Sequence, residues 1–204
     1  MGIAERKARQ KQGMRQEILD AARDLFVREG YDNVSMRKIA EKIEYSPTTI
    51  YLYFKDKAEL VESLCEETFA RLLATLERIG VQSSDPVARL RACCRAYVDF
   101  GLKHPDHYRI TFLLNAGENE MKVHAASAHD MGMRTFMYLR DGVEQCIARG
   151  GFRRVDLDVA SQAIWSSLHG ITALLIVKPG FPWADKNQVI DMVIDNLIRG
   201  MQAG

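Results

Sequence analysis

The sequence is poor in cysteine and in proline, with four and five of 204 residues. Its cysteines have neither the spacing of metal ligands nor the density of a secreted disulfide scaffold; they are Cys65, Cys93, Cys94 and Cys146. We expect reduced thiols in a core, with redox sensing as the alternative. A glycine-rich phosphate loop, a nucleophile elbow and metal-ligand spacing are also missing, which argues against an enzyme. No cofactor is implied.

Long apolar runs and charge of one sign are scarce as well. The formal net charge is +1, so the protein is not basic all over. No apolar run approaches the roughly 20 residues of a membrane span, and the polar start lacks the apolar core of a signal peptide. We therefore expect a cytoplasmic protein with no membrane partner.

Alternating strand patterns and internal repeats are absent, whereas helical spacing recurs along the chain. With 47% hydrophobic residues, the chain is long enough for one small and one medium domain. The prediction is an all-α protein of about nine helices. Residues 115–128 are small, polar and weakly patterned, and we expect either a mobile connection or a continuation of the next helix.

The stretch from Ser46 to Lys57 predicts two successive helix starts. Ser46 is a good N-cap and Pro47 suits the first helical position. Ile50 and Phe54 fall on one side at i, i+4. The residues left to face outward or sideways carry hydroxyl groups; they are Thr48, Thr49, Tyr51 and Tyr53.

A second helix start follows directly. Asp56 and Glu59 resemble a capping box, and they place Lys57 at a helix N-terminus, where backbone amides favour anions. The helix that begins there is expected to run to Ile79 and to end at Gly80.

Two helices should precede this stretch. A short amphipathic helix over 35–43, with Ser35 as a cap, leads into the turn Glu44-Tyr45-Ser46. A third helix should pack behind the pair and end at Gly30; its apolar stripe is Ile18, Ala21, Ala22, Leu25 and Phe26.

Residues from about 15 to 60 resemble the N-terminal DNA-binding domain of the TetR family of bacterial transcriptional regulators. The features that match are Ile18-Leu19-x-Ala21-Ala22-x-x-Leu25-Phe26, Gly30-Tyr31, Ile39-Ala40 and Ser46-x-x-Thr49-Ile50-Tyr51-x-Tyr53-Phe54-x-x-Lys57-x-x-Leu60. The chain departs from the family pattern at Thr48, where a small residue is usual, and at Tyr53, where His is common. The resemblance implies a three-helix helix-turn-helix domain over 15–58, which binds a double-stranded DNA operator.

Chemistry divides the expected DNA contacts into two kinds. Small hydroxyl side chains can approach base edges and thymine methyl groups, and the candidates are Tyr45, Ser46, Thr48 and Thr49. Phosphate contacts fix register, and the candidates are Ser35, Arg37, Tyr51, Tyr53 and Lys57. For Tyr51, packing on the first helix is the alternative. Because few residues reach bases, we expect two half-sites and a palindromic operator.

Residues 1–14 form a basic arm, with Arg6, Lys7, Arg9 and Lys11 against Glu5. Such an arm either reaches phosphates or a minor groove, or is a solvated tail.

The segment 163–170, which reads A-I-W-S-S-L-H-G, and the run His104-Pro105-x-x-Tyr108-Arg109 resemble a C-terminal domain of some TetR-like regulators that is named for its Trp-His-Gly residues. The resemblance implies that residues 59–204 form a helical effector-binding and dimerisation domain. Its effector is a small molecule of unknown identity.

Candidate effector contacts are aromatic and methionine side chains, which suit bulky apolar molecules. They are Tyr108, Phe112, Met133, Phe136, Met137, Trp165 and His169. Trp165 and His169 share a helix face at i, i+4, although any of the seven can instead be ordinary core. His104 and His107 suggest a metal site or, alternatively, simply the start of a helix.

The last two helices, expected over 157–177 and 185–201, are apolar on more than one side, which favours a homodimer through a two-fold four-helix interface over burial within one chain. The interface candidates are Leu168, Leu175, Val189, Val193 and Leu197. The interpretation is a homodimeric repressor released by an apolar or amphipathic small molecule. The alternative is a DNA-binding interaction protein of the same fold, regulated by a protein partner without an effector.

Overall fold

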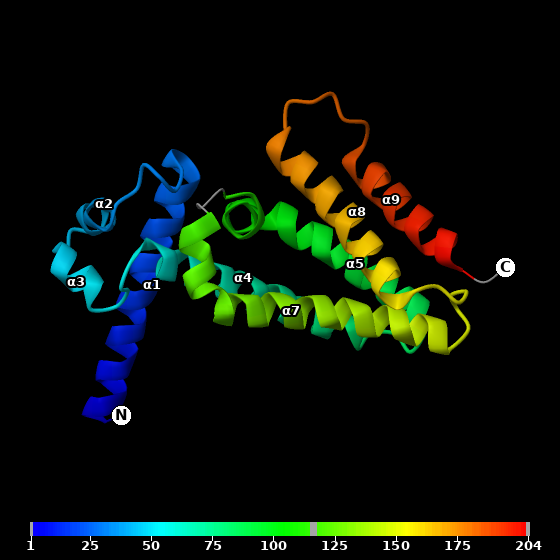
Figure 1. Cartoon of the computed structure of the whole chain (residues 1–204), viewed down its shortest axis with the longest axis horizontal. Coiled ribbons are helices and arrows are strands. Elements are labelled where there is room, and N and C mark those ends of the chain that lie inside the picture. The colour runs from blue at the N-terminus through cyan, green and yellow to red at the C-terminus, as the bar shows by residue number, and fades with distance from the viewer. Residues whose placement is uncertain (1, 115–117, 203–204) are drawn as a thin grey trace. The chain divides into compact units, whose positions relative to one another are not determined.

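The computed structural model describes residues 2–114 and 118–202, and it describes side chains at all of these except position 3 and positions 118–130. Within the described residues the chain forms nine α-helices and one π-helical turn (Figure 1), and the single β pairing is an isolated bridge between Phe152 and Gln202. In chain order the elements are α1 (Ile3–Glu29), α2 (Met36–Lys42), α3 (Pro47–Tyr51), α4 (Lys57–Gly80), α5 (Pro86–Lys103), α6 (Pro105–Tyr108), the π turn (Arg109–Leu113), α7 (Glu118–Ala148), α8 (Leu157–Val177) and α9 (Lys186–Met201). The predicted all-α class with about nine helices is confirmed.

Side-chain caps explain where several helices begin. A hydroxyl or carboxylate oxygen accepts a backbone N–H of the first turn at 2.9–3.2 Å, at Ser35, Ser46, Asp85, Asp156 and Asp185. Each of these contacts satisfies an amide that has no partner inside its own helix. The helix starts are therefore local properties of the sequence.

The chain divides into two compact units, and the first comprises Met1–Thr68 with Asp106–Asp130. Its core contains the predicted apolar stripe of α1 together with the buried residues of α2, α3 and the first turns of α4. Gly30, at φ +81°, ends α1 in a conformation that L side chains rarely adopt. Ile110, only 3% exposed, packs into the same core from the π turn, so this unit is built from two separate stretches of chain.

His107 binds the second stretch to the first by two hydrogen bonds. The Thr68 hydroxyl donates to the Leu64 carbonyl at 2.7 Å, so it accepts from His107 Nδ1 at 3.1 Å. His107 Nε2 then accepts from Arg23 Nη1 at 3.2 Å. These contacts join α6 to α1 and α4 within the first unit.

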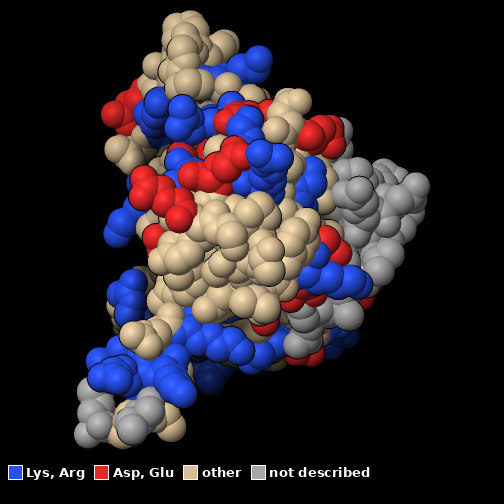
Figure 2. Space-filling model, turned by 90° about the vertical axis from the view of Figure 1, so that its left-hand side faces the viewer, with Lys and Arg blue, Asp and Glu red and all other residues tan. Residues whose placement is uncertain are grey.

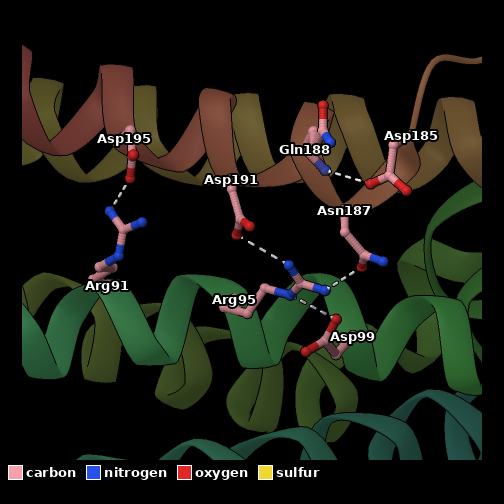
Figure 3. A network of polar contacts seen from close by, with 8 residues as sticks. All are labelled: Arg91, Arg95, Asp99, Asp185, Asn187, Gln188, Asp191 and Asp195. Carbon is pink, nitrogen blue, oxygen red and sulfur yellow. Dashed lines mark hydrogen bonds and ion pairs between the residues drawn. The ribbon is translucent and has the colours of Figure 1, made fainter.

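The second unit comprises Phe69–Pro105 and Met131–Gly204, and in it α5, α8 and α9 pack against one another in pairs. Its buried rows include Ile190, Ile194 and Ile198 on α9. A polar ladder crosses from α5 to α9 (Figure 3): Arg95 contacts Asp191 at 3.0 Å and Asn187 at 2.6 Å, and Arg91 pairs with Asp195. The ladder fixes the register of α9 on α5.

One expectation about apolar runs was wrong. By length and composition alone, α8 could cross a membrane, since it has 21 residues and a mean hydropathy of 1.3. Its row of buried residues, among them Ile164, Leu168 and Thr172, packs within the second unit. A core helix that is covered on two sides passes the same test, because its sequence is apolar over most of its circumference.

The expected connection over 115–128 falls partly outside the described residues, which do not include 115–117. From Glu118 onward the backbone is helical and forms the first part of α7. The alternative in which this stretch continues the next helix therefore holds from Glu118.

Candidate nucleic-acid interface and apolar surfaces

The turn between α2 and α3 is tight and is held by hydrogen bonds. Tyr45 donates its backbone N–H to the Ala40 carbonyl at 3.0 Å, and Ser46 caps α3 through Thr49 N–H at 3.2 Å. Glu44 lies at φ +59°, in the left-handed region that tight turns use. This geometry confirms the short helix, turn and second short helix that the sequence predicted.

The outer side of α3 carries the candidate DNA contacts. Thr48 is exposed, Tyr51 is 56% exposed and Tyr45 is 40% exposed. Ile50 is fully buried beneath them. Figure 2 faces the side on which Figure 1 shows α2 and α3, and a broad uncharged surface lies at its centre. The face is therefore rich in hydroxyl groups and poor in charge, and hydroxyl groups are among the side-chain groups that can contact base edges.

Two candidates on α3 or directly after it are already engaged locally. Thr49 Oγ1 lies 2.9 Å from Ser46 Oγ, which also caps the helix. Tyr53 is half-buried against the core of the first unit. The side chains with the freest approach to a ligand on this helix are therefore Thr48 and Tyr51.

Sequence reasoning missed Leu52, which is 75% exposed directly after α3. It lies roughly 200° around a helix from Ile50, so the spacing that buries Ile50 and Phe54 could have revealed it. An exposed apolar side chain beside hydroxyl groups suits contact with thymine methyl groups.

Lys57, a candidate phosphate contact, also has a structural role. Its ammonium donates to the Tyr31 carbonyl at 2.9 Å and lies 4.2 Å from the centroid of the Tyr31 ring. An ammonium has three donors, so the carbonyl uses one of them. Lys57 thereby holds the first turn of α4 against the segment that follows α1.

The remaining phosphate candidates lie on α2 and at its start. Ser35 uses its hydroxyl as the α2 cap. Arg37 pairs with Glu41 at 2.9 Å, one turn along the helix, and its side chain remains 79% exposed. An exposed i, i+4 pair of this kind contributes little stability, so it does not prevent Arg37 from reaching a phosphate.

The start of α4 has the predicted cap. Asp56 accepts the Glu59 N–H at 2.9 Å, and the Glu59 carboxylate in turn accepts the backbone N–H of Lys55 at 2.6 Å. The reciprocal partner is thus Lys55 rather than Asp56, one residue earlier than in a standard capping box.

The two histidines around Pro105 have separate structural roles. His104 caps the end of α5, and its ring lies 4.9 Å from that of Phe100. Burial lowers its pKa, with further lowering from Lys103 and Arg71. His107 is held by Thr68 and Arg23, as described above. Among the described residues no group of three His, Cys, Asp or Glu side chains could hold a metal ion.

The effector candidates fall into two sets. In the first unit Tyr108 is 1% exposed, and its ring lies 4.7 Å from that of Phe112. In the second unit the ring centroid of Trp165 on α8 lies 6.1 Å from that of Phe136 on α7, in an edge-on arrangement. It lies 6.1 Å from the ring centroid of His169 as well. Burial lowers the pKa of His169, which favours the neutral ring.

The second set is open at the surface. Trp165 is 42% exposed, Met133 is 45% exposed and Met137 is 38% exposed. We call Met133, Phe136, Met137, Trp165 and His169 the α7–α8 cluster. Exposed aromatic and methionine side chains on neighbouring stretches of two helices offer a surface that gains free energy when an apolar molecule or chain covers it.

The interface candidates divide by burial. Leu168 and Leu175 are 3% and 4% exposed, because they point into the core of their own subunit. Val189, Val193 and Leu197 are half-buried. Besides Trp165, the more exposed large apolar side chains of α8 and α9 are Val159, Leu174, Val177 and Met192. Periodicity could not make this distinction, since several faces of α8 are apolar.

The cysteines are buried, as expected for core thiols. Burial raises the pKa of Cys65 and of Cys146 to about 11, and that of Cys94 to about 12. Thiols with such pKa values are scarcely ionised near neutral pH and react slowly.

A short capped helix that presents hydroxyl groups after a tight turn, in an all-helical protein, defines a helix-turn-helix DNA-binding regulator. Comparison with known proteins agrees: residues 18–64 match the family described as bacterial regulatory proteins, tetR family, and residues 90–199 match the tetracyclin repressor-like C-terminal domain. The second match alone spans more than half of the chain. The chain therefore belongs to the tetR family, whose members are DNA-binding regulators and not enzymes.

Individual relatives agree with this assignment. An uncharacterized HTH-type transcriptional regulator of Haemophilus influenzae is 40% identical over 68 residues, which are 33% of this chain and 36% of that protein. The match thus spans about a third of that relative's length. The HTH-type transcriptional repressor NicS of Pseudomonas putida is 26% identical over 96% of both chains.

Among solved structures, a protein with unknown function from Rhodococcus sp. RHA1 superposes with a TM-score of 0.78 at 25% identity, over 93% of this chain and 95% of that one. The architecture of both units is thus shared with a solved protein. The finer Trp-His-Gly resemblance of the C-terminal domain stays a prediction.

Proposed function

We propose that this protein is a cytoplasmic, homodimeric repressor that binds a palindromic operator and is released by an apolar or amphipathic small molecule. The observation that carries the DNA-binding part is the outer side of α3, where Thr48 and Tyr51 are exposed above the fully buried Ile50. Family membership and the similarity to NicS, a transcriptional repressor, support the direction of regulation.

Reading of the operator is assigned to α3 and the turn before it. A threonine hydroxyl both donates and accepts, so Thr48 can pair with either edge of a base pair, and Thr49, Ser46 and Tyr45 lie beside it. Tyr51, Tyr53, Lys57, Ser35 and Arg37 position the helix through phosphates. Because α3 has only five residues, one copy reads few bases, and a second copy on a second half-site supplies the remaining specificity.

Dimerisation is assigned to the outer faces of α8 and α9. Val189, Val193 and Leu197 remain in the proposal because they are half-buried and keep accessible surface. Leu168 and Leu175 are replaced by exposed neighbours, since their own subunit covers them. The exposed members are Val159, Leu174, Val177 and Met192. Four helices, two from each copy, would cover this surface in a two-fold arrangement.

Effector binding is assigned to the α7–α8 cluster in the second unit, which lies within residues 59–204. Trp165 and Phe136 offer ring area, the methionines adapt in shape, and the neutral His169 offers one polar contact. An effector releases DNA only if it binds the DNA-incompatible arrangement more tightly, by about 1–3 kcal/mol of coupling free energy.

A second candidate function keeps DNA binding but replaces the effector by a protein partner. It is favoured by the same exposed apolar side chains, because a partner protein could cover Trp165, Met133 and Met137 equally well.

Fluorescence anisotropy of labelled DNA from immediately upstream of the protein's own coding region tests the proposal. The duplex is titrated with protein and then with a panel of hydrophobic and aromatic compounds. We expect tight, salt-sensitive binding that one chemical class reverses. Binding that no compound disturbs supports the protein-partner function, and an absence of salt-sensitive binding contradicts both.

Two substitutions separate reading from positioning. Thr48→Ala should change base preference by about 1–3 kcal/mol at one position of each half-site, while Tyr51→Ala should weaken binding to all sequences alike. Competition against a set of single-base operator variants measures both effects. A uniform loss for Thr48→Ala would show that it makes no base contact.

A further inference from the structure

The N-terminal half of α1 packs against nothing in its own unit. Every residue from Ala4 to Gly13 is exposed, and the first fully buried residue is Ile18. Figure 1 shows this part of α1 running on past α3 toward the N-terminus. The ten exposed residues extend about 15 Å at 1.5 Å per residue. Tertiary packing therefore does not account for this stretch being helical.

Cations in the two halves of α1 differ in their partners. In the packed half Arg23 pairs with Asp20, and Arg28 pairs with Asp24. Among the described residues no ion pair or hydrogen bond involves a cationic side chain of the exposed half; those side chains are Arg6, Lys7, Arg9 and Lys11. The sole carboxylate there, that of Glu5, accepts the Gly2 backbone N–H at 2.9 Å.

Helix electrostatics oppose this arrangement in the free protein. Arg6 lies in the first turn of α1, at the positive end of the helix dipole, and like charges at i, i+4, such as Lys7 and Lys11, repel each other. A polyanion that lies alongside offsets both costs. The charge pattern is thus complementary to an anionic partner and not to solvent alone.

One row of side chains on α1 lies on the same face as the contact between α1 and the segment that follows α3. Lys7, Lys11 and Arg15 follow at i, i+4 and i+8, so they share a face. Arg15 donates to Ser63 Oγ at 2.9 Å, and its guanidinium carbon lies 5.0 Å from the centroid of the Phe54 ring. Phe54 lies three residues after the end of α3. Along the axis of α1, Lys11 and Lys7 therefore lie about 6 and 12 Å beyond Arg15, which contacts the turn between α3 and α4.

We infer that Lys7 and Lys11 form a second DNA-contact surface, which binds the sugar-phosphate backbone flanking the bases that α3 reads. This inference rests on the proposed function. It assigns to the N-terminal half of α1 a share of affinity and of salt dependence, and no share of base preference, because lysine contacts to phosphate carry no sequence information.

The test is the salt dependence of binding by the full-length protein. The DNA is a fluorescein-labelled 60-base-pair duplex from immediately upstream of its coding region and, in parallel, an unrelated duplex of equal length. The variant Lys7→Gln with Lys11→Gln should lower the slope of log affinity against log salt by about 2 per protomer, equally on both duplexes. Its affinity at about 0.1 M salt should fall roughly tenfold or more.

Two controls make the result specific. Arg149→Gln with Arg154→Gln removes two exposed cations from the second unit and should leave the slope unchanged. The variant Lys7→Gln, Ala8→Lys, Lys11→Gln, Gln12→Lys keeps the net charge but rotates the row by about 100°. It should behave like the neutralised variant. A slope equal to that of the unmodified protein would overturn the assigned face.

The two proposals fail differently. If the unmodified protein shows no salt-dependent binding to either duplex, the proposed function fails. If it binds both with a steep slope and the Lys7→Gln, Lys11→Gln variant keeps that slope, DNA binding stands and the second contact surface is wrong. Circular dichroism of each variant checks that the helical content of the packed part is retained.

Discussion

The two compact units differ in the side chains that they expose. In the first unit the exposed surface around α3 carries hydroxyl groups beside the exposed Leu52, whereas Phe54 and Ile50 are almost fully buried. In the second unit Trp165, Leu174 and Met192 are 42%, 51% and 66% exposed. A surface that discriminates bases needs polar groups held in place, whereas a surface that binds apolar matter needs accessible hydrocarbon. The contrast indicates different partners for the two units.

The largest effect is expected inside the second unit, between a buried and a half-buried apolar residue. Leu168→Ala should lower the free energy of unfolding by about 2–5 kcal/mol, since it leaves a cavity at a 3% exposed site. Val193→Asp should leave the subunit folded and convert dimer to monomer, because a charge would lie in the proposed interface. Urea denaturation and sedimentation velocity measure the two outcomes. A Val193→Asp protein that sediments as a dimer would put the interface elsewhere.

A smaller effect is expected inside the first unit, between two neighbouring lysines. Lys57→Met removes the hydrogen bond to the Tyr31 carbonyl and the ammonium from the Tyr31 ring, which should cost about 1–2 kcal/mol of stability. Lys55→Met changes an exposed side chain and should change stability by less than about 0.5 kcal/mol. Thermal denaturation compares them. Equal effects would mean that the Tyr31 contact contributes nothing.

The smallest effect is a pH dependence of stability. The pKa of His169 is lowered from its ordinary value of 6.5 by burial, and that of His104 by burial, Lys103 and Arg71. As the pH falls below about 6.5 the unfolded chain takes up protons more readily than the folded one, so these groups favour unfolding. Stability should therefore be full well above pH 6.5 and decline as the pH falls through that value.

The matched substitution for this prediction is His169→Gln, which should flatten part of the decline. Urea denaturation at a series of pH values measures it. The pKa of Asp24 is lowered chiefly by its hydrogen bond to Lys42, and the positive charges of Lys42 and Arg28 lower it further. The contribution of this carboxylate to the stability of the fold is therefore lost only in stronger acid. A slope unchanged in His169→Gln would remove His169 from the account.

Features that depend on neighbouring residues could be predicted from the sequence. The bounds of α8 were expected at 157 and 177 and are observed there, because Asp156 caps its start and the apolar spacing is continuous. The helix-turn-helix and its buried Ile50 followed in the same way from Ser46 and Pro47. Local hydrogen bonds and i, i+4 spacing determine these elements.

Features that depend on distant residues could not be predicted. Lys57 reaches the carbonyl of Tyr31, 26 residues away, and His107 reaches Arg23, 84 residues away. Nothing in the spacing of either residue indicates such a partner. The inward row of α8 was equally hidden, because a helix that is apolar on several sides offers no periodic signal for which row its own subunit will cover.

The return of Ile110 into the core of the first unit has a consequence for synthesis. Residues 1–68 leave the ribosome well before residues 106–114, so the DNA-binding unit waits, while about 40 residues are added at about 5–20 per second, for the side chain that completes its core. During that interval of some seconds the apolar core of the first unit lacks the side chain of Ile110 and is incompletely covered. Because α5 precedes residues 106–114 in the chain, it must be synthesised before the first unit can complete its core. A ribosome stalled within α5 would therefore carry a DNA-binding unit with an incomplete core.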